Sequence, residues 1–199
     1  ASRQKEEFKP IKSGEVGIYS CGPTVYSSPH IGNMYAYICW DVLARTLKYL
    51  DYEVHNVINI TDVGHLVSDS DEGEDKMEKG SKREGMTAKE LAEKYEKEFI
   101  ENLNELNIEL PWKMPRATEH IEEQINLIKK IEANGFTYKT SDGIYFDTAK
   151  FGDYGKFANL NLEKIREGAR VEINEEKRNP TDFALWKFSP KNEKRQMEW

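Results

Sequence analysis

"VGIYSCGPTVYSSPHIGNMYAYICWDVLARTLKYLDYEVHNVINIT", residues 16–61, is the stretch of sequence that decides the fold. It opens with "VGIYS", a short apolar run that stops at the turn formers Gly22 and Pro23, as a buried strand does. A second strand is predicted at "YEVHNVINIT", residues 52–61. Between them, apolar residues at helical spacing predict a helix of about 20 residues; they are Ile31, Tyr35, Ile38, Val42, Leu47 and Leu50. Strand, helix and strand in this order form the βαβ unit of a parallel sheet, so we expect an α/β fold.

Composition limits the class of protein. The chain has 199 residues, a net charge of -7, 38% hydrophobic residues and 33% charged residues, which suits a soluble globular protein of one or two domains. No apolar run reaches the roughly 20 residues of a membrane span, and the first ten residues lack the apolar core of a signal peptide. We therefore expect a cytoplasmic, monomeric protein without membrane contact. The acidic total argues against sequence-independent binding of polyanions, although it leaves a local nucleic-acid site possible.

After the βαβ unit, residues 62–87 are polar and predict a loop with at most one helical turn around 76–79. Thr87 and Glu90 form a capping box for a helix that runs to the prolines of "NIELPWKMP". Beyond Pro115 the pattern changes, and we interpret residues 1–111 as one domain and 112–199 as an α+β insertion.

Within residues 112–199, Thr118 is expected to cap a helix that stops at Asn134-Gly135. "FTYKTSDGIYFDT" predicts a hairpin that turns at Ser141-Asp142-Gly143. A loop with a short helix follows, and "NPTDFALWKFS" predicts one more strand.

Chemically active side chains gather where the first strand ends and the helix begins. Cys21 follows the first strand and Thr61 ends the second, and ligands bind at such carboxyl ends in parallel sheets. His30, Gly32 and Asn33 lie at the helix N-terminus, where free amides and the helix dipole attract anions. Structural alternatives remain open: Cys21 as a small buried hydrophobe, and His30 as no more than a helix cap. The other cysteine, Cys39, lies inside the helix and is expected to be a core thiol.

"CGPTVYSSPHIGN" closely resembles the signature of class I aminoacyl-tRNA synthetases, and in detail that of the cysteinyl-tRNA synthetase family. The likeness continues in "NITDVGH", "PRATEHI", "GARVEI" and "KRNPTDFALWK", in the order of that family. The resemblance implies a Rossmann-like nucleotide-binding fold. Residues 1–111 would form its first half and residues 112–199 the inserted connective-peptide subdomain, while the second half of the catalytic domain and the anticodon-binding domain are expected to lie outside the chain.

The same resemblance implies roles for individual residues. Cys21 corresponds to the first ligand of a Zn²⁺ ion whose further ligands lie outside this chain. The residues implied for ATP are Pro23, His30, Ile31, Gly32 and Asn33, of which His30 and Asn33 are also the implied catalytic residues, and those implied for the amino acid are Gly22, Thr24 and Thr61.

The implied reaction uses ATP with Mg²⁺ to activate L-cysteine as cysteinyl-adenylate, and then transfers the cysteinyl group to tRNA(Cys). A substrate thiolate can complete a tetrahedral zinc shell, whereas a serine hydroxyl is a much poorer ligand. Such a metal bond would discriminate strongly between the two amino acids.

Three departures from the family pattern affect whether this chain is expected to be a complete enzyme. Asn33 replaces the last histidine of the HIGH motif, "VGHL" follows "NITD" as in a divergent branch, and the KMSKS loop is absent from the 199 residues. We therefore expect an incomplete part of the enzyme. The alternatives are a ligase that joins cysteine to an amino sugar in thiol biosynthesis, and a truncated, non-catalytic paralogue that binds a nucleotide or RNA.

Overall fold

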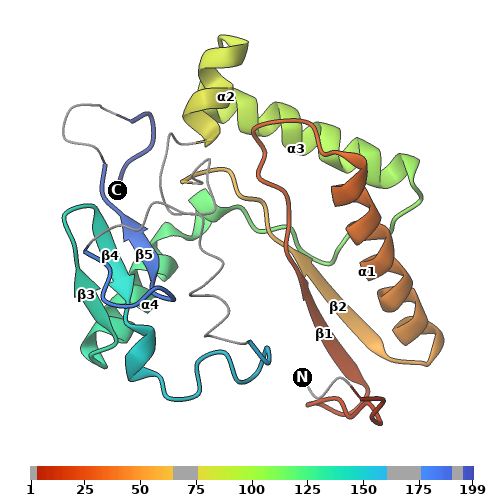
Figure 1. Ribbon diagram of the computed structural model, residues 1–199. Helices are drawn as coiled ribbons and strands as arrows, with labels where there is room; N and C mark the ends of the chain where they lie inside the picture. The colour runs from red at the N-terminus through yellow and green to blue at the C-terminus, as the bar shows by residue number, and fades with distance from the viewer. Residues whose placement is uncertain (1–3, 65–75, 161–175, 190–194) are drawn as a thin grey trace. The chain divides into compact units, whose positions relative to one another are not determined.

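The computed structural model describes residues 4–64, 76–160, 176–189 and 195–199 (Figure 1). The contacts divide the chain into two units, built mainly from residues 6–65 and 74–121 and from residues 122–199. We call them the βαβ unit and the hairpin unit. The short helix expected after residue 160, the "GARVEI" motif and most of the acidic loop before residue 76 lie outside the described residues.

The βαβ unit contains the predicted parallel strands. β1 (Glu15–Ser20) and β2 (Glu53–Ile58) pair in parallel along their whole length, with Glu15 opposite Glu53 and Ser20 opposite Ile58. The helix α1 (Ile31–Tyr49) connects them (Figure 1). The α/β fold class is therefore confirmed.

A third extended segment runs beside β2. Val57 and Ile60 form parallel bridges with Lys113 and Arg116, and the amide of Ile60 donates to the carbonyl of Pro115 at 2.9 Å. We expected residues from 112 onward to belong to the insertion, but the contacts place residues up to Ile121 in the βαβ unit. The proline-rich composition of this segment hid its strand-like pairing, because proline has no amide to donate.

The apolar positions that mark α1 in the sequence are not the ones that it buries. Ile31, Tyr35 and Val42 are 89%, 68% and 57% exposed, whereas the buried residues of the helix are Met34, Tyr37 and Ala44. Cys39 is also exposed, so the expectation of a core thiol is wrong. The run "MYAYICW" is apolar around the whole helix, so spacing alone could not select the buried face.

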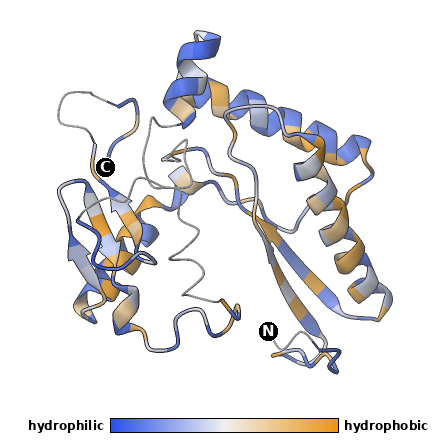
Figure 2. Ribbon diagram, viewed as in Figure 1, coloured by the Kyte–Doolittle hydropathy of each residue, from blue (hydrophilic) through white to orange (hydrophobic). Residues whose placement is uncertain are grey.

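Two helices follow the second strand in the described chain. α2 (Lys76–Glu84) has nine residues where we expected a single turn, because Met77, Gly80 and Ser81 are buried by tertiary packing that propensity does not report. α3 (Ala88–Glu105) begins at Thr87 with both bonds of the predicted capping box. Figure 2 shows both as mostly hydrophilic helices with hydrophobic residues interspersed; those fully buried in α3 include Leu91, Phe99 and Leu103.

One predicted cap is wrong. Thr118 lies in the short 3-10 helix η1 (Ala117–His120), and both its amide and its hydroxyl donate to Asp62, the last residue of "NITD". The following helix, α4 (Ile121–Ala133), therefore starts without Thr118 as its cap. It does stop at the predicted place, where Gly135 adopts a φ of +78°.

The hairpin unit contains an antiparallel sheet of order β3-β4-β5. β3 (Thr137–Lys139) and β4 (Gly143–Phe146) form the predicted hairpin, and β5 (Phe183–Lys187) is the predicted last strand. The 3-10 helix η2 (Thr148–Lys150) follows β4.

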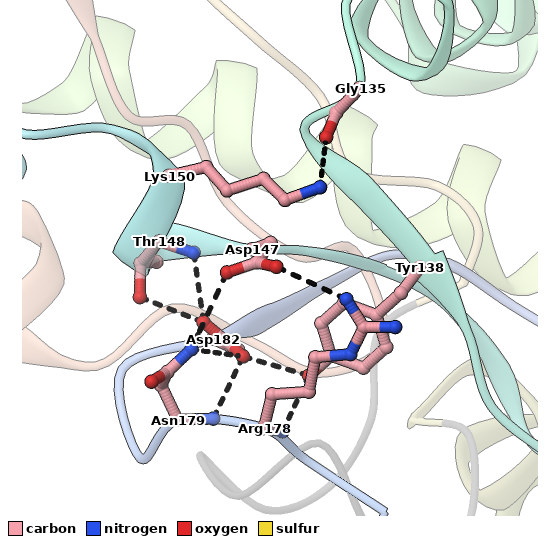
Figure 3. A network of polar contacts seen from close by, with 8 residues as sticks. All are labelled: Gly135, Tyr138, Asp147, Thr148, Lys150, Arg178, Asn179 and Asp182. Carbon is pink, nitrogen blue, oxygen red and sulfur yellow. Dashed lines mark hydrogen bonds and ion pairs between the residues drawn. The ribbon is translucent and has the colours of Figure 1, made fainter.

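A buried carboxylate joins the parts of the hairpin unit. Asp182 is 2% exposed and accepts hydrogen bonds from the Tyr138 hydroxyl at 2.8 Å and from the amides of Thr148 and Asn179, each at 2.9 Å (Figure 3). Since these donors come from β3, from η2 and from the segment before β5, one side chain fixes all three.

Among the described residues, we find no helix that has both the length and the apolar character needed to cross a membrane.

Candidate functional site

The first part of the site is the extended segment that follows β1. Cys21 follows the last residue of β1, and its thiol is exposed, with Sγ 3.9 Å from the carbonyl oxygen of Gly22. The Tyr37 hydroxyl of α1 lies 3.4 Å from the carbonyl oxygen of Cys21 and donates to it. Burial, reinforced by Cys21, raises the pKa of Tyr37, so this hydroxyl remains a neutral donor. The reading of Cys21 as a small buried hydrophobe is therefore wrong.

At Gly22 the backbone lies close against Asn59, the residue that follows β2. A Cβ atom at this position would lie 1.5 Å from the carbonyl oxygen of Asn59, so only glycine fits. Its amide donates to Oδ1 of Asn59 at 2.8 Å. Cys21 is thereby held beside the end of the second strand.

The residues implied for amino-acid binding come together here. Thr24 and Thr61 form a parallel bridge, in which the Thr61 amide donates to Pro23 at 3.0 Å and the Val25 amide donates to Thr61 at 3.1 Å. The parallel pairing thus continues past the ends of β1 and β2. Gly22, Thr24 and Thr61 are therefore neighbours at the carboxyl edge of the sheet, as the sequence predicts.

Asn59 is a member of this group that the sequence analysis missed. Its carboxamide accepts from the Gly22 amide and from the Tyr19 hydroxyl, the latter at 2.9 Å, and it donates to Oγ1 of Thr61 at 3.0 Å. A signal was available, because asparagine is disfavoured in strands and here stands two residues before the threonine of the motif.

The second part of the site is the N-terminus of α1. His30 is the N-cap residue, its Nδ1 accepts from the Asn33 amide at 3.3 Å, and Oδ1 of Asn33 accepts from the His30 amide at 3.1 Å. The capping role that we considered for His30 is therefore real. Because Nδ1 accepts, the neutral ring carries its proton on Nε2. That nitrogen and Nδ2 of Asn33 are the donors that the cap leaves available.

Gly32 protects this arrangement. A Cβ atom there would lie 3.1 Å from both Cε1 and Nδ1 of His30, so a side chain would crowd the capping ring. The amides of Ile31 and Gly32 make no hydrogen bond to any group that the structure describes, and both residues are exposed. A helix start with free, exposed amides can bind an anion.

The described residues do not form a complete metal site in this region. They contain no group of three or more histidine, cysteine, aspartate or glutamate side chains that could hold a metal ion. The exposed Cys21 thiol suits a zinc ligand chemically, but a structural zinc site needs four.

Comparison with known proteins places these features in a family. Residues 7–199 match the family model described as "tRNA synthetases class I (C) catalytic domain". A cysteine–tRNA ligase of Treponema denticola is 50% identical over 98% of this chain and 40% of its own length. One from Thermus thermophilus is 46% identical over 94% of this chain and 39% of its own length. The chain thus spans about two fifths of the curated relatives it matches.

A solved structure supports the fold independently. The Mycobacterium tuberculosis methionyl-tRNA synthetase in complex with methionyl-adenylate matches 66% of this chain and 24% of its own chain, with a TM-score of 0.54. Its sequence is 22% identical, so this likeness supports the Rossmann-like architecture alone.

Proposed function

We propose a function from one premise, which is that the chain belongs to the family of class I (C) tRNA synthetase catalytic domains. In this proposal, the chain forms part of an enzyme that activates L-cysteine with ATP and transfers it to tRNA(Cys). The observation that carries the proposal is the pairing of Thr24 with Thr61 in the segment that begins with the exposed Cys21, in a chain 50% identical to a cysteine–tRNA ligase.

The N-terminus of α1 is the proposed place for the phosphates of ATP, which enters with Mg²⁺. Nε2 of His30, Nδ2 of Asn33 and the free amides of Ile31 and Gly32 are all donors, and no carboxylate lies in the first turn of the helix. As the carboxylate of cysteine attacks the α-phosphorus, negative charge grows on the departing pyrophosphate. Fixed donors at a helix N-terminus stabilise such charge without rearranging. Pro23 would contact ATP from the segment that follows β1.

The end of the parallel pairing is the proposed place for the amino acid. Gly22 and Thr24 offer backbone groups, and Thr61 offers a hydroxyl whose Oγ1 already accepts from Asn59. Since each is held by the pairing described above, the amino acid would meet groups that are fixed before it binds. Such preorganisation orients the carboxylate for attack.

Cys21 is the proposed zinc ligand from this chain. When bound, zinc supplies a coordination position that a substrate thiolate fills better than a hydroxyl. The described residues contain no group of three or more candidate ligands, whereas four are expected, so we propose that further ligands come from outside this chain.

We propose that the protein acts in the cytoplasm, where it would meet these reactants. We also propose that it is a monomer, and size-exclusion chromatography with light scattering tests this oligomeric state.

The test of the reaction is ATP–pyrophosphate exchange by the full-length protein. We expect exchange to require cysteine, and the activated cysteine to pass to tRNA(Cys). Transfer to an amino sugar instead would favour the thiol-biosynthesis ligase. Binding of ATP without any exchange would favour a non-catalytic module, and either result would contradict the proposal.

A further inference from the structure

The side chain of Asn59 contacts the backbone next to Cys21, the proposed metal ligand, and the side chain of Thr61, which is proposed to contact the substrate. Its carboxamide bonds to the amide that follows Cys21 and to the hydroxyl of Thr61, at 2.8 and 3.0 Å. We propose that Asn59 is a positioning residue for cysteine binding, which sets the direction of the Thr61 hydroxyl and the place of the Cys21-Gly22 backbone. This inference rests on the function proposed above.

The strand geometry separates Asn59 from the core. Ile58 and Ile60, its neighbours, are 2% and 0% exposed, and successive side chains of a strand point to opposite faces. Asn59 therefore shares its face with Thr61, two residues on, and neither is buried. The carboxamide thus contributes little apolar packing, and its role must come from its three hydrogen bonds.

The direction of each hydrogen bond follows from chemistry. The Gly22 amide can only donate, so the carboxamide atom that faces it is the oxygen, which also accepts from the Tyr19 hydroxyl. The other end is then the NH₂ group, which donates to Oγ1 of Thr61. As a result, the Thr61 proton cannot point toward Asn59 and is left to donate to a ligand.

Asn59→Asp tests this direction because it preserves the shape of the side chain. One carboxylate oxygen can still accept from Gly22 and Tyr19, but the other would now accept from Thr61 and turn the Thr61 proton away from the ligand. If Asn59 only held the Gly22 backbone in place, cysteine binding would survive the substitution. If Asn59 also directs the Thr61 proton toward the ligand, cysteine binding would weaken.

The experiment measures cysteine-dependent ATP–pyrophosphate exchange by the full-length protein. For Asn59→Asp we expect the KM for cysteine to rise about 10-fold, as for other residues that orient a ligand-contacting group, with the KM for ATP unchanged. The matched control is Asn104→Asp, the same chemical change at an exposed position of α3, which should alter neither constant.

A double mutant separates action through Thr61 from a general effect. In a Thr61→Val background, Asn59→Asp should add almost nothing to the KM for cysteine, because the hydroxyl that it reorients is gone. A further 10-fold rise there, or equal rises of both KM values in the single variant, would overturn the inference.

If Asn59→Asp does not fold, a milder variant tests the same inference. Tyr19→Phe removes a single bond to Oδ1 from a side chain that is 69% exposed, so the fold should persist. We expect the KM for cysteine to rise about threefold and the KM for ATP to stay constant; an unchanged KM for cysteine would overturn the inference. Wild-type protein without cysteine-dependent exchange would refute the proposed function and the inference with it, whereas active wild type with unaltered variants would refute the inference alone.

Discussion

Replacing the buried carboxylate Asp182 should be among the most destabilising changes in the hairpin unit. Asp182→Ala leaves five donor groups without this acceptor: the Tyr138 hydroxyl, the backbone amides of Thr148 and Asn179, the Thr148 hydroxyl and the Asn179 side-chain amide (Figure 3). Each buried donor left unpaired costs about 1–3 kcal/mol, and the bonds from the Tyr138 hydroxyl and from the amide and hydroxyl of Thr148 are buried, so we expect a loss of at least about 3 kcal/mol in the free energy of unfolding. Asp182→Asn retains one acceptor oxygen and should lose about half as much.

The charge of Asp182 adds a dependence on pH. Burial raises its pKa, but the hydrogen bonds from Thr148, Tyr138 and Asn179 outweigh burial, so the pKa in the folded protein lies below the ordinary value of 3.8. A carboxylate with a lowered pKa stabilises the fold above its unfolded pKa, and this stabilisation is lost as the pH falls through the folded value. The difference between wild type and Asp182→Asn should therefore shrink below about pH 4.

Urea unfolding at pH 7 and at pH 3, followed by circular dichroism and tryptophan fluorescence, measures both effects. Asp153→Asn is the control, because the Asp153 side chain is 70% exposed in its ion pair with Lys156 and should change stability by less than about 0.5 kcal/mol. A loss at Asp182 no larger than at Asp153, or a difference between wild type and Asp182→Asn that stays constant from pH 7 to pH 3, would refute the reasoning.

Three further predictions test the βαβ unit, the last with a matched exposed position. Gly22→Ala would place its methyl 1.5 Å from the Asn59 carbonyl oxygen, so the segment that follows β1 must move. We expect at least about 2 kcal/mol of lost stability in urea unfolding, from the hydrogen bonds that the shift breaks. Thr87→Ala should cost about 1 kcal/mol by removing the cap of α3, and amide hydrogen exchange should quicken in its first turn and nowhere else. Leu103→Ala should cost about 2–5 kcal/mol at a fully buried position, whereas Val42→Ser at 57% exposure should stay within about 0.5 kcal/mol; thermal or urea unfolding that ranks them equally would contradict the assigned burial.

Much of the fold could be predicted because local signals agreed with one another. The apolar runs before and after α1 predicted the parallel pair of strands, the capping box at Thr87 predicted the start of α3, and Gly143 predicted the hairpin turn. In each case the periodicity, the turn residues and the caps pointed to the same element. The neighbouring positions of Cys21 and Thr61 followed from the same reasoning, since carboxyl ends of parallel strands share an edge; the roles of the site residues remain proposals that came from the resemblance.

What the sequence could not predict depends on contacts between distant residues. The buried face of α1 was hidden because its apolar residues surround the helix. Thr118 resembled a cap, but Asp62, 56 residues earlier, captures its amide and hydroxyl. The role of Asn59 depends on Gly22, 37 residues away, whose proximity follows only from the strand pairing. No local pattern encodes such partners.

The most direct test of the proposed function compares cysteine with serine as substrates in ATP–pyrophosphate exchange, using the full-length wild-type protein and Cys21→Ser. In the proposed function, the segment that follows β1 selects the amino acid and the N-terminus of α1 binds the phosphates of ATP. This proposal predicts that wild type strongly prefers cysteine, and that Cys21→Ser loses this preference and bound zinc while its KM for ATP remains unchanged. A preference for cysteine that survives the substitution, or equal losses toward cysteine and ATP, would contradict it.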